Sequence, residues 1–210
     1  MADAAVLAAI LGALLLGAMS PGPSFVLVSR ISVTASRRDG VAAALGMGIG
    51  GAFFASLALV GLIALLQQTE WLFLGLKICG GLYLLYLGIR IWRSADDPLE
   101  LDPALGGPVP GSAWRALGLG LATQVANPKT AIVYGSIFAA LLPGDPSGVL
   151  LVLLPPSVFL LEAGWYAAVA VVFSSSGPQR AYLRGKRWFD RLAGCVLGGL
   201  GVRLIVEEAR

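Results

Sequence analysis

Two short polar segments interrupt long apolar runs, and each combines proline with side chains that form hydrogen bonds. The first reads Ser20-Pro21-Gly22-Pro23 with Ser24 directly after it, and the second reads Asn127-Pro128-Lys129-Thr130. Proline inside a helix removes a backbone donor and clashes with the preceding turn. Asparagine favours the N-cap, and proline favours the first position of a new helix. We therefore predict that a helix ends and restarts at each segment.

The start of a helix can bind an anion. Its first turn exposes unpaired N–H groups and a partial positive charge of roughly half a unit, which suits an anion such as a carboxylate. We therefore expect a substrate to bind where the two segments meet, although proline and glycine also kink membrane helices merely for packing. The residues expected to bind it are Ser20, Pro21, Gly22, Pro23, Ser24, Asn127, Pro128, Lys129 and Thr130, with Trp165 and Tyr166 lining the same cavity.

Three charged side chains lie within apolar runs: Lys77, Lys129 and Glu162. An ionised side chain near the middle of a bilayer costs about 2.5–3.5 kcal/mol on insertion scales, so Lys129 and Glu162 should face the protein interior. We predict that Glu162 binds and releases a proton as part of the protein's function. The alternative is a permanent Glu162–Lys129 ion pair that only joins two helices. Lys77 lies near a helix end, where it either reaches the interface or contributes to the site.

The amino-acid composition indicates whether the predicted helices contact water or lipid. The chain has 210 residues, of which 57% are hydrophobic and 13% charged, with a mean hydropathy of +0.83. Soluble domains are about a quarter charged, so the chain is expected to be an integral membrane protein in contact with the lipid bilayer. A net charge of +3 fits basic cytoplasmic loops, and we expect no nucleic-acid partner.

Histidine is absent and there are only two cysteines. Zinc sites and catalytic triads that need imidazole therefore lack their ligands, so we expect no metal, no cofactor and no enzyme activity. Cys79 and Cys195 lie in apolar runs and are expected to be small buried residues. An alternative function keeps both as a membrane thiol-redox relay, although a reactive thiolate needs an electropositive, accessible setting.

An all-α protein with six membrane spans fits the hydropathy pattern. A span needs about 20 apolar residues, and we predict spans at residues 4–35, 41–66, 71–92, 114–142, 148–173 and 189–206. The chain then divides into a three-helix half over residues 1–92, a polar cytoplasmic linker over residues 93–113 and a second three-helix half over residues 114–210.

The basic residues orient these spans. Eleven of them fall on one side of the six spans, against Arg203 and Arg210 on the other. The basic side is expected to be cytoplasmic and both termini non-cytoplasmic. Three spans per half invert the second half, as in many transporters. In keeping with this, Gly81 and Leu87-Gly88 recur as Gly194 and Leu200-Gly201 at one offset.

Together these elements resemble the LysE/RhtB amino-acid exporter family over nearly the whole chain. The matching residues are the Ser20–Pro23 segment, Lys77 to Gly80 with Tyr83-Leu84 and Leu87-Gly88, Asn127-Pro128-Lys129, and the basic stretch leading to Gly194 and Leu200-Gly201. Glu162 stands where the family usually has aspartate, and Ser24 where it commonly has asparagine.

The resemblance implies two inverted three-helix repeats in the bacterial inner membrane. It also implies export of amino acids or related metabolites, driven by the proton gradient or the membrane potential. A scaffold protein that transports nothing is a third possibility. The sequence leaves homo-oligomer formation open.

Overall fold

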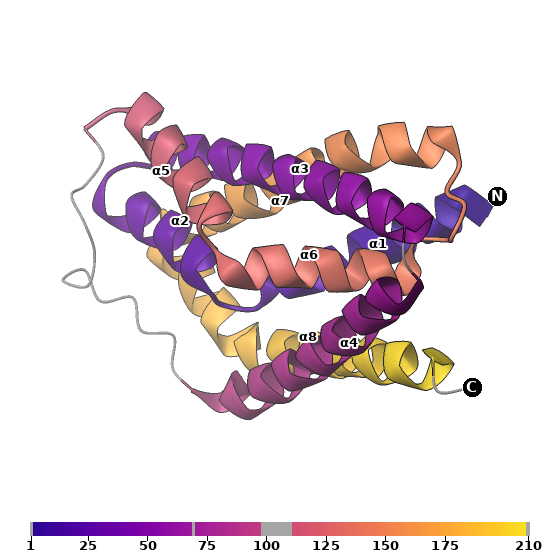
Figure 1. Ribbon diagram of the computed structural model, residues 1–210. Helices are drawn as coiled ribbons and strands as arrows, with labels where there is room; N and C mark the ends of the chain where they lie inside the picture. The colour runs from indigo at the N-terminus through magenta and orange to yellow at the C-terminus, as the bar shows by residue number, and fades with distance from the viewer. Residues whose placement is uncertain (1, 69, 98–110, 209–210) are drawn as a thin grey trace.

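The computed structural model describes residues 2–68, 70–97 and 111–208, which form an all-helical bundle with no strand in these ranges. The helices are α1 (Ala2–Met19), α2 (Pro23–Thr34), α3 (Arg37–Gln68), α4 (Glu70–Arg93), the short 3-10 helix η1 (Ser94–Asp96), α5 (Ala113–Val125), α6 (Pro128–Leu141), α7 (Gly148–Phe173) and α8 (Ser176–Glu208). Figure 1 places both termini at one end of the bundle, together with the α3–α4 and α6–α7 connections. The α2–α3 turn, the start of α5 and the α7–α8 turn lie at the other end. We call these the termini end and the linker end.

Both predicted helix breaks are confirmed. The axes of α1 and α2 differ by 60° across the break, where Gly22 is the N-cap of α2 and Pro23 its first residue. Asn127 is the N-cap of α6 and accepts a hydrogen bond from the backbone N–H of Lys129. Pro155 and Pro156, in contrast, lie inside α7, which continues through them. Proline alone therefore does not end a helix here; the two breaks each have a favoured N-cap residue directly before the proline.

Several helices are long and apolar enough to cross a membrane. In the described part of the chain, α3, α4 and α7 meet this condition singly, and the bent pair α1–α2 meets it together. The protein is thus a multi-pass membrane protein by the length and composition of these helices. The helix α8 differs from the expectation, because it begins at Ser176 rather than near residue 189. Lys186, expected in a loop, is therefore a buried helical residue.

The two long helices of each half pack against helices of the other half. Gly40 of α3 faces Ala170 of α7 and Gly51 faces Glu162, so α3 and α7 run antiparallel. The helices α4 and α8 touch through glycines. A Cβ atom added to Gly81 would lie 2.9 Å from the Gly201 carbonyl oxygen, and one on Gly88 would lie 2.6 Å from the Gly194 carbonyl oxygen.

The cysteines lie outside this contact. Cys79 and Cys195 are both free and exposed, so the expectation that they are buried is wrong. The glycines occupy the faces through which α4 and α8 touch, and the neighbouring cysteines consequently point away from the contact.

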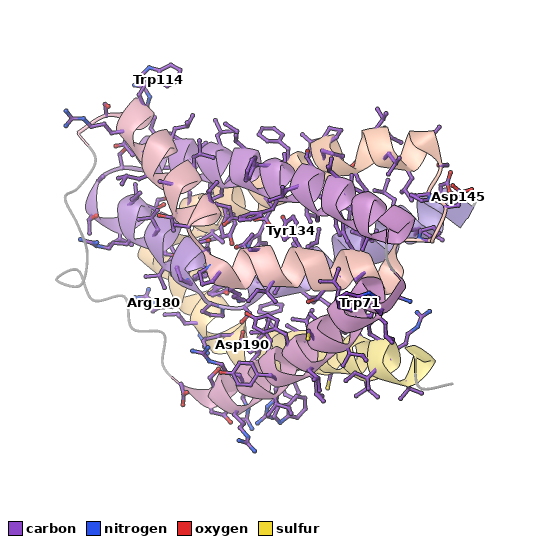
Figure 2. The ribbon with its side chains drawn as sticks, in the orientation of Figure 1. Trp71, Trp114, Tyr134, Asp145, Arg180 and Asp190 are labelled. Carbon is purple, nitrogen blue, oxygen red and sulfur yellow. The ribbon has the colours of Figure 1, made fainter. Side chains whose placement is uncertain are left out.

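The buried apolar residues form two separate clusters. The termini-side core contains Ile10, Leu14, Leu84, Ile137 and Leu154, among others. The linker-side core contains Phe25, Val28, Met47, Val169 and Phe173, among others. Tyr134 belongs to the termini-side core and lies in the middle of the bundle, whereas Trp71 and Trp114 lie at its edges (Figure 2). These two tryptophans are 72% and 81% exposed, as expected of residues at membrane interfaces.

Candidate functional site

A small polar cavity lies where the two helix breaks meet. Its lining includes Leu14 and Tyr134 from the termini-side core and Phe25 and Tyr166 from the linker-side core. The cavity volume is about 30 Å³, enough for one or two water molecules. Pockets that hold a ligand are usually about 300–1,000 Å³. The cavity in this conformation is therefore too small to hold such a ligand.

A chain of hydrogen bonds joins the two breaks. Asn127 Nδ2 donates to Ser24 Oγ at 3.1 Å, and Ser24 Oγ donates to Gln124 Oε1 at 2.6 Å. All three side chains are buried. Ser24 lies in the first turn of α2, Gln124 in the last turn of α5 and Asn127 between α5 and α6. The breaks of the two halves are thus in direct contact.

Glu162 continues this chain from α7. Gln124 Nε2 donates to Glu162 Oε2 at 3.2 Å, and the Tyr134 hydroxyl donates to Glu162 Oε1 at 2.8 Å. Each carboxyl oxygen of this buried side chain therefore has one donor. The side chain fits because its neighbour on α3 is Gly51, where a Cβ atom would come within 2.9 Å of Glu162 Cγ.

Lys129 reaches in a different direction, to the end of α1. Its ammonium group donates to the carbonyl oxygens of Gly17 at 3.3 Å and Ser20 at 3.2 Å. The last carbonyls of a helix have no partners within the helix and carry a partial negative charge. Trp165 Nε1 donates to the Ala18 carbonyl at 3.2 Å. The Tyr182 hydroxyl of α8 donates to the Met19 carbonyl at 3.3 Å. Each carbonyl of residues 17–20 therefore accepts a side-chain hydrogen bond.

The comparison with known proteins fits this geometry. The profile of the family described as LysE type translocator matches residues 15–208, which include both helix breaks and Glu162. The chain belongs to the LysE type translocator family. The resemblance predicted from the sequence is thereby confirmed.

Curated relatives of this LysE type translocator cover most of its length. It is 33% identical over 195 residues to the threonine efflux protein of Escherichia coli (strain K12), covering 90% of this chain and 92% of that protein. It is also 33% identical over 193 residues to the threonine efflux protein of Salmonella typhi, with the same coverage. An uncharacterized membrane protein of Escherichia coli (strain K12), YahN, is 30% identical over 188 residues, covering 90% of this chain and 83% of that protein. No solved structure matches the chain.

Most of the residues predicted to bind substrate lie together in this LysE type translocator. Those that line the cavity are Ser20, Gly22, Ser24, Asn127, Lys129, Thr130 and Tyr166, together with the predicted proton-coupling residue Glu162. Pro23 and Pro128 are exposed and instead begin α2 and α6. Pro21 lies in the break but outside the cavity lining. Trp165 lies outside the lining and donates a hydrogen bond to the Ala18 carbonyl at the end of α1. Lys77 is half-buried on α4 and also lies outside the lining.

The charged residues do not form the direct pair considered from the sequence. Among the described residues, Lys129 and Glu162 hydrogen-bond to different groups, and no ion pair joins them. Two polar residues of the cavity lining were missed, Gln124 and Tyr134. Their signals were weak but present: Gln124 is a polar residue in an apolar helix one turn before Asn127, and Tyr134 follows Thr130 by one helical turn.

The thiol-redox alternative has no support in this LysE type translocator. Cys79 and Cys195 lie outside the cavity lining, and the described part of the chain places neither next to the polar network. The names of the relatives refer to efflux or to an uncharacterized membrane protein.

Proposed function

We propose that this protein exports a small zwitterionic amino acid, with threonine as the first candidate, through the cavity between the two helix breaks. The observation that carries the proposal is the content of that cavity: one ammonium group, one carboxyl group and several uncharged hydrogen-bonding side chains. A zwitterion presents the complementary carboxylate and ammonium groups. The 33% identical relatives named threonine efflux protein support the same class of substrate.

The substrate carboxylate binds at the start of α2. The N-cap residue Gly22 makes no side-chain capping hydrogen bond, so the first N–H groups of α2 are available to an anion. The Lys129 Nζ atom lies 3.5 Å from the position that a Gly22 Cβ would take, and it adds a positive charge there. The start of α6 is less suitable, because the Asn127 side chain already caps it.

The substrate ammonium group binds at Glu162. A buried carboxylate inside a membrane protein attracts a cation, either a proton or an ammonium group. Among the described residues, Glu162 Oε1 and Oε2 each accept one hydrogen bond, which leaves acceptor capacity on both oxygens. One carboxylate neutralises one cation at a time. Proton binding from outside therefore alternates with substrate binding from inside, and this exchange couples export to the proton gradient.

The topology belongs to the same proposal. We propose six crossings, with the α1–α2 and α5–α6 pairs each counted as one, which puts both termini on the same side of a bacterial inner membrane. Because the basic residues gather at the linker end, that end is the cytoplasmic one, both termini are non-cytoplasmic, and residues 93–113 form a cytoplasmic linker. Residues 98–110 of that linker lie outside the described part of the chain. The glycine contacts support two inverted repeats. If Gly81 corresponds to Gly194 and Gly88 to Gly201, the contact Gly81–Gly201 becomes the contact Gly194–Gly88, which is also present.

Transport by purified protein in proteoliposomes tests the proposal. We expect the wild-type protein to exchange radiolabelled threonine and to respond to an imposed pH gradient, and the Glu162→Gln variant to lose that response at normal abundance. Asp145→Asn is the matched control, because it makes the same acid-to-amide change at an exposed loop position. Full pH-driven transport by Glu162→Gln would refute the coupling role. Absence of Glu162→Gln from the membrane would indicate that the residue serves folding instead.

A further inference from the structure

The ring of Phe25 belongs to the linker-side core and also forms part of the cavity wall. Phe25 lines the cavity and is buried. Its ring stacks on Tyr182 of α8, with 5.4 Å between centroids and an interplanar angle of 24°, and it meets the edge of Phe173 at 5.5 Å. Tyr182 also stacks on Phe189 at 6.1 Å. Phe173 and Tyr182 lie on either side of the α7–α8 turn, so this aromatic cluster closes the cavity toward the linker end.

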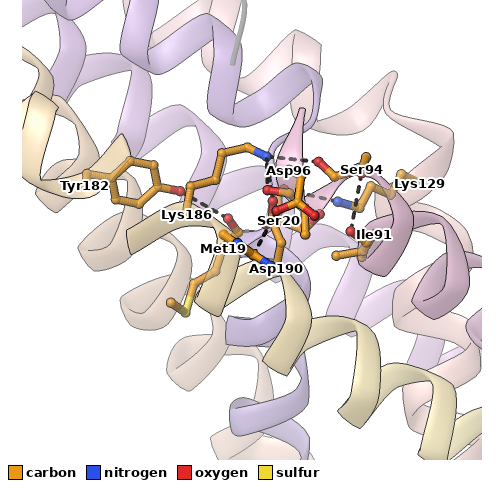
Figure 3. A network of polar contacts seen from close by, with 11 residues as sticks. Met19, Ser20, Ile91, Ser94, Asp96, Lys129, Tyr182, Lys186 and Asp190 are labelled. Carbon is orange, nitrogen blue, oxygen red and sulfur yellow. Dashed lines mark hydrogen bonds and ion pairs between the residues drawn. The ribbon is translucent and has the colours of Figure 1, made fainter. Parts of the chain in front are cut away.

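Tyr182 also binds the broken end of α1. Its hydroxyl donates to the Met19 carbonyl oxygen at 3.3 Å (Figure 3). This is the fourth of the side-chain hydrogen bonds to residues 17–20 described above. The first turns of α8 therefore contact the same helix end that Lys129 contacts from inside the cavity.

The next two turns of the same face of α8 carry a buried ion pair. Lys186 and Asp190 follow Tyr182 at spacings of four and eight residues, and Lys186 Nζ lies 2.8 Å from Asp190 Oδ2. Lys186 Nζ also donates to the Ser94 carbonyl oxygen at 3.2 Å, which connects α8 to η1, directly after α4 (Figure 3). On the outer side, Arg187 pairs with Asp96 at 2.8 Å.

The ion pair is poorly arranged for stability. Asp190 Oδ1 is buried and has no hydrogen-bond partner among the described residues. A buried pair offsets its desolvation only when its remaining donors and acceptors are also satisfied. The Lys186–Asp190 pair therefore stabilises the contact of α8 less than a fully hydrogen-bonded pair would. Next to it, Tyr182 makes side-chain contacts that can separate, whereas the glycine contact between α4 and α8 brings the backbones together.

We infer that Tyr182, Lys186 and Asp190 of α8 form the gate that closes the transport cavity toward the linker end, the cytoplasmic side in the proposed topology. The inference rests on the proposed transport function. When the gate opens, Tyr182 leaves Phe25 and the Met19 carbonyl, and a substrate from the cytoplasm reaches the Ser24–Asn127 contact.

Thiol labelling of the cavity tests the gate. The reporter is Thr130→Cys in a Cys79→Ser/Cys195→Ser background, and the probe is a membrane-impermeant maleimide added to inside-out or right-side-out vesicles. With Tyr182→Ala added, we expect labelling in inside-out vesicles to become at least tenfold faster, which corresponds to about 1.4 kcal/mol. Labelling in right-side-out vesicles should stay unchanged. Tyr182→Leu keeps much of the side-chain volume and should give the same result if Tyr182→Ala does not fold.

The control is Tyr86→Ala, which makes the same change at a tyrosine that is 56% exposed on α4; its labelling rates should match those of the reporter alone. Unchanged labelling in a folded Tyr182 variant would overturn the gate, and so would an equal increase in both kinds of vesicle. The readout needs no substrate. Threonine transport is measured separately in the protein that keeps Thr130. One-sided labelling of the reporter without threonine transport by that protein would reject threonine and keep the gate, whereas transport with unchanged labelling would reject the gate alone.

Discussion

Gly51 lies on α3 directly against the Glu162 side chain, which makes Gly51→Ala a sharp test of the site. The added Cβ atom would lie 2.9 Å from Glu162 Cγ and 3.0 Å from the Tyr134 hydroxyl oxygen. Carbon atoms prefer separations of about 3.5–4.0 Å, so Glu162 has to move by about 0.6 Å or more. This displacement acts on the 2.8 Å hydrogen bond between the Tyr134 hydroxyl and Glu162.

Stability and transport should respond differently to this change. Overfilling a packed interior costs about 1–3 kcal/mol, while alanine in place of glycine within a helix stabilises by about 0.5–1 kcal/mol. The net loss of stability should therefore be about 2.5 kcal/mol or less. A hydrogen bond to a charged group contributes about 1.5–3 kcal/mol. If transport depends on the arrangement of Glu162, its rate should fall by about tenfold to a hundredfold.

The assay is threonine efflux at matched protein abundance, together with thermal unfolding of the purified protein in detergent. Gly61→Ala is the control, because it makes the same change on the same helix where a Cβ atom meets nothing within 4 Å. We expect Gly61→Ala to transport at the wild-type rate. Wild-type efflux by Gly51→Ala would refute the reasoning, and an equal loss in the two variants would do so as well.

Three further predictions concern other contacts. Gly88→Ala should remove most folded protein from the membrane, because its Cβ would lie 2.6 Å from backbone atoms of α8 that cannot move aside, whereas Gly118→Ala should leave abundance unchanged in immunoblots. Asn127→Ala loses a helix cap of about 1 kcal/mol and the hydrogen bond to the other break; efflux should fall at near-normal abundance, and Asn127→Asp should restore the cap but not efflux. The Cys79→Ser/Cys195→Ser variant should keep full efflux. Loss of efflux in this variant would support the thiol-redox relay instead.

The sequence predicts the two breaks well because their causes are local. Pro23 and Pro128 follow residues that favour an N-cap position, and this pattern needs no tertiary information. The meeting of the breaks was expected from their similar places in two halves. The hydrogen bond from Asn127 to Ser24 agrees with that expectation.

Partners of the charged groups were not predictable in the same way. Lys129 and Glu162 have opposite charges and similar depths, which made a direct pair one of two possibilities, but the end of α1 offers Lys129 two carbonyl oxygens. Such acceptors exist only because the helix stops, and no sequence pattern specifies which cation reaches them. The first turns of α8 were missed because Lys186 belongs to a basic stretch typical of a loop, and its burial depends on its contacts with Asp190 and with η1.

The end of α1 has a consequence for how quickly the cavity can widen. Side chains from α6, α7 and α8 satisfy the last three carbonyl groups of α1 and the Ser20 carbonyl that follows them. Each carbonyl that loses its partner in a dry interior costs about 1–3 kcal/mol. A shift of any of these three helices therefore becomes favourable only when water replaces the lost donor. Hydration and helix movement must then proceed together. A variant that excludes water from the end of α1 should therefore slow the opening of the transporter, even if the changed residue does not contact the substrate.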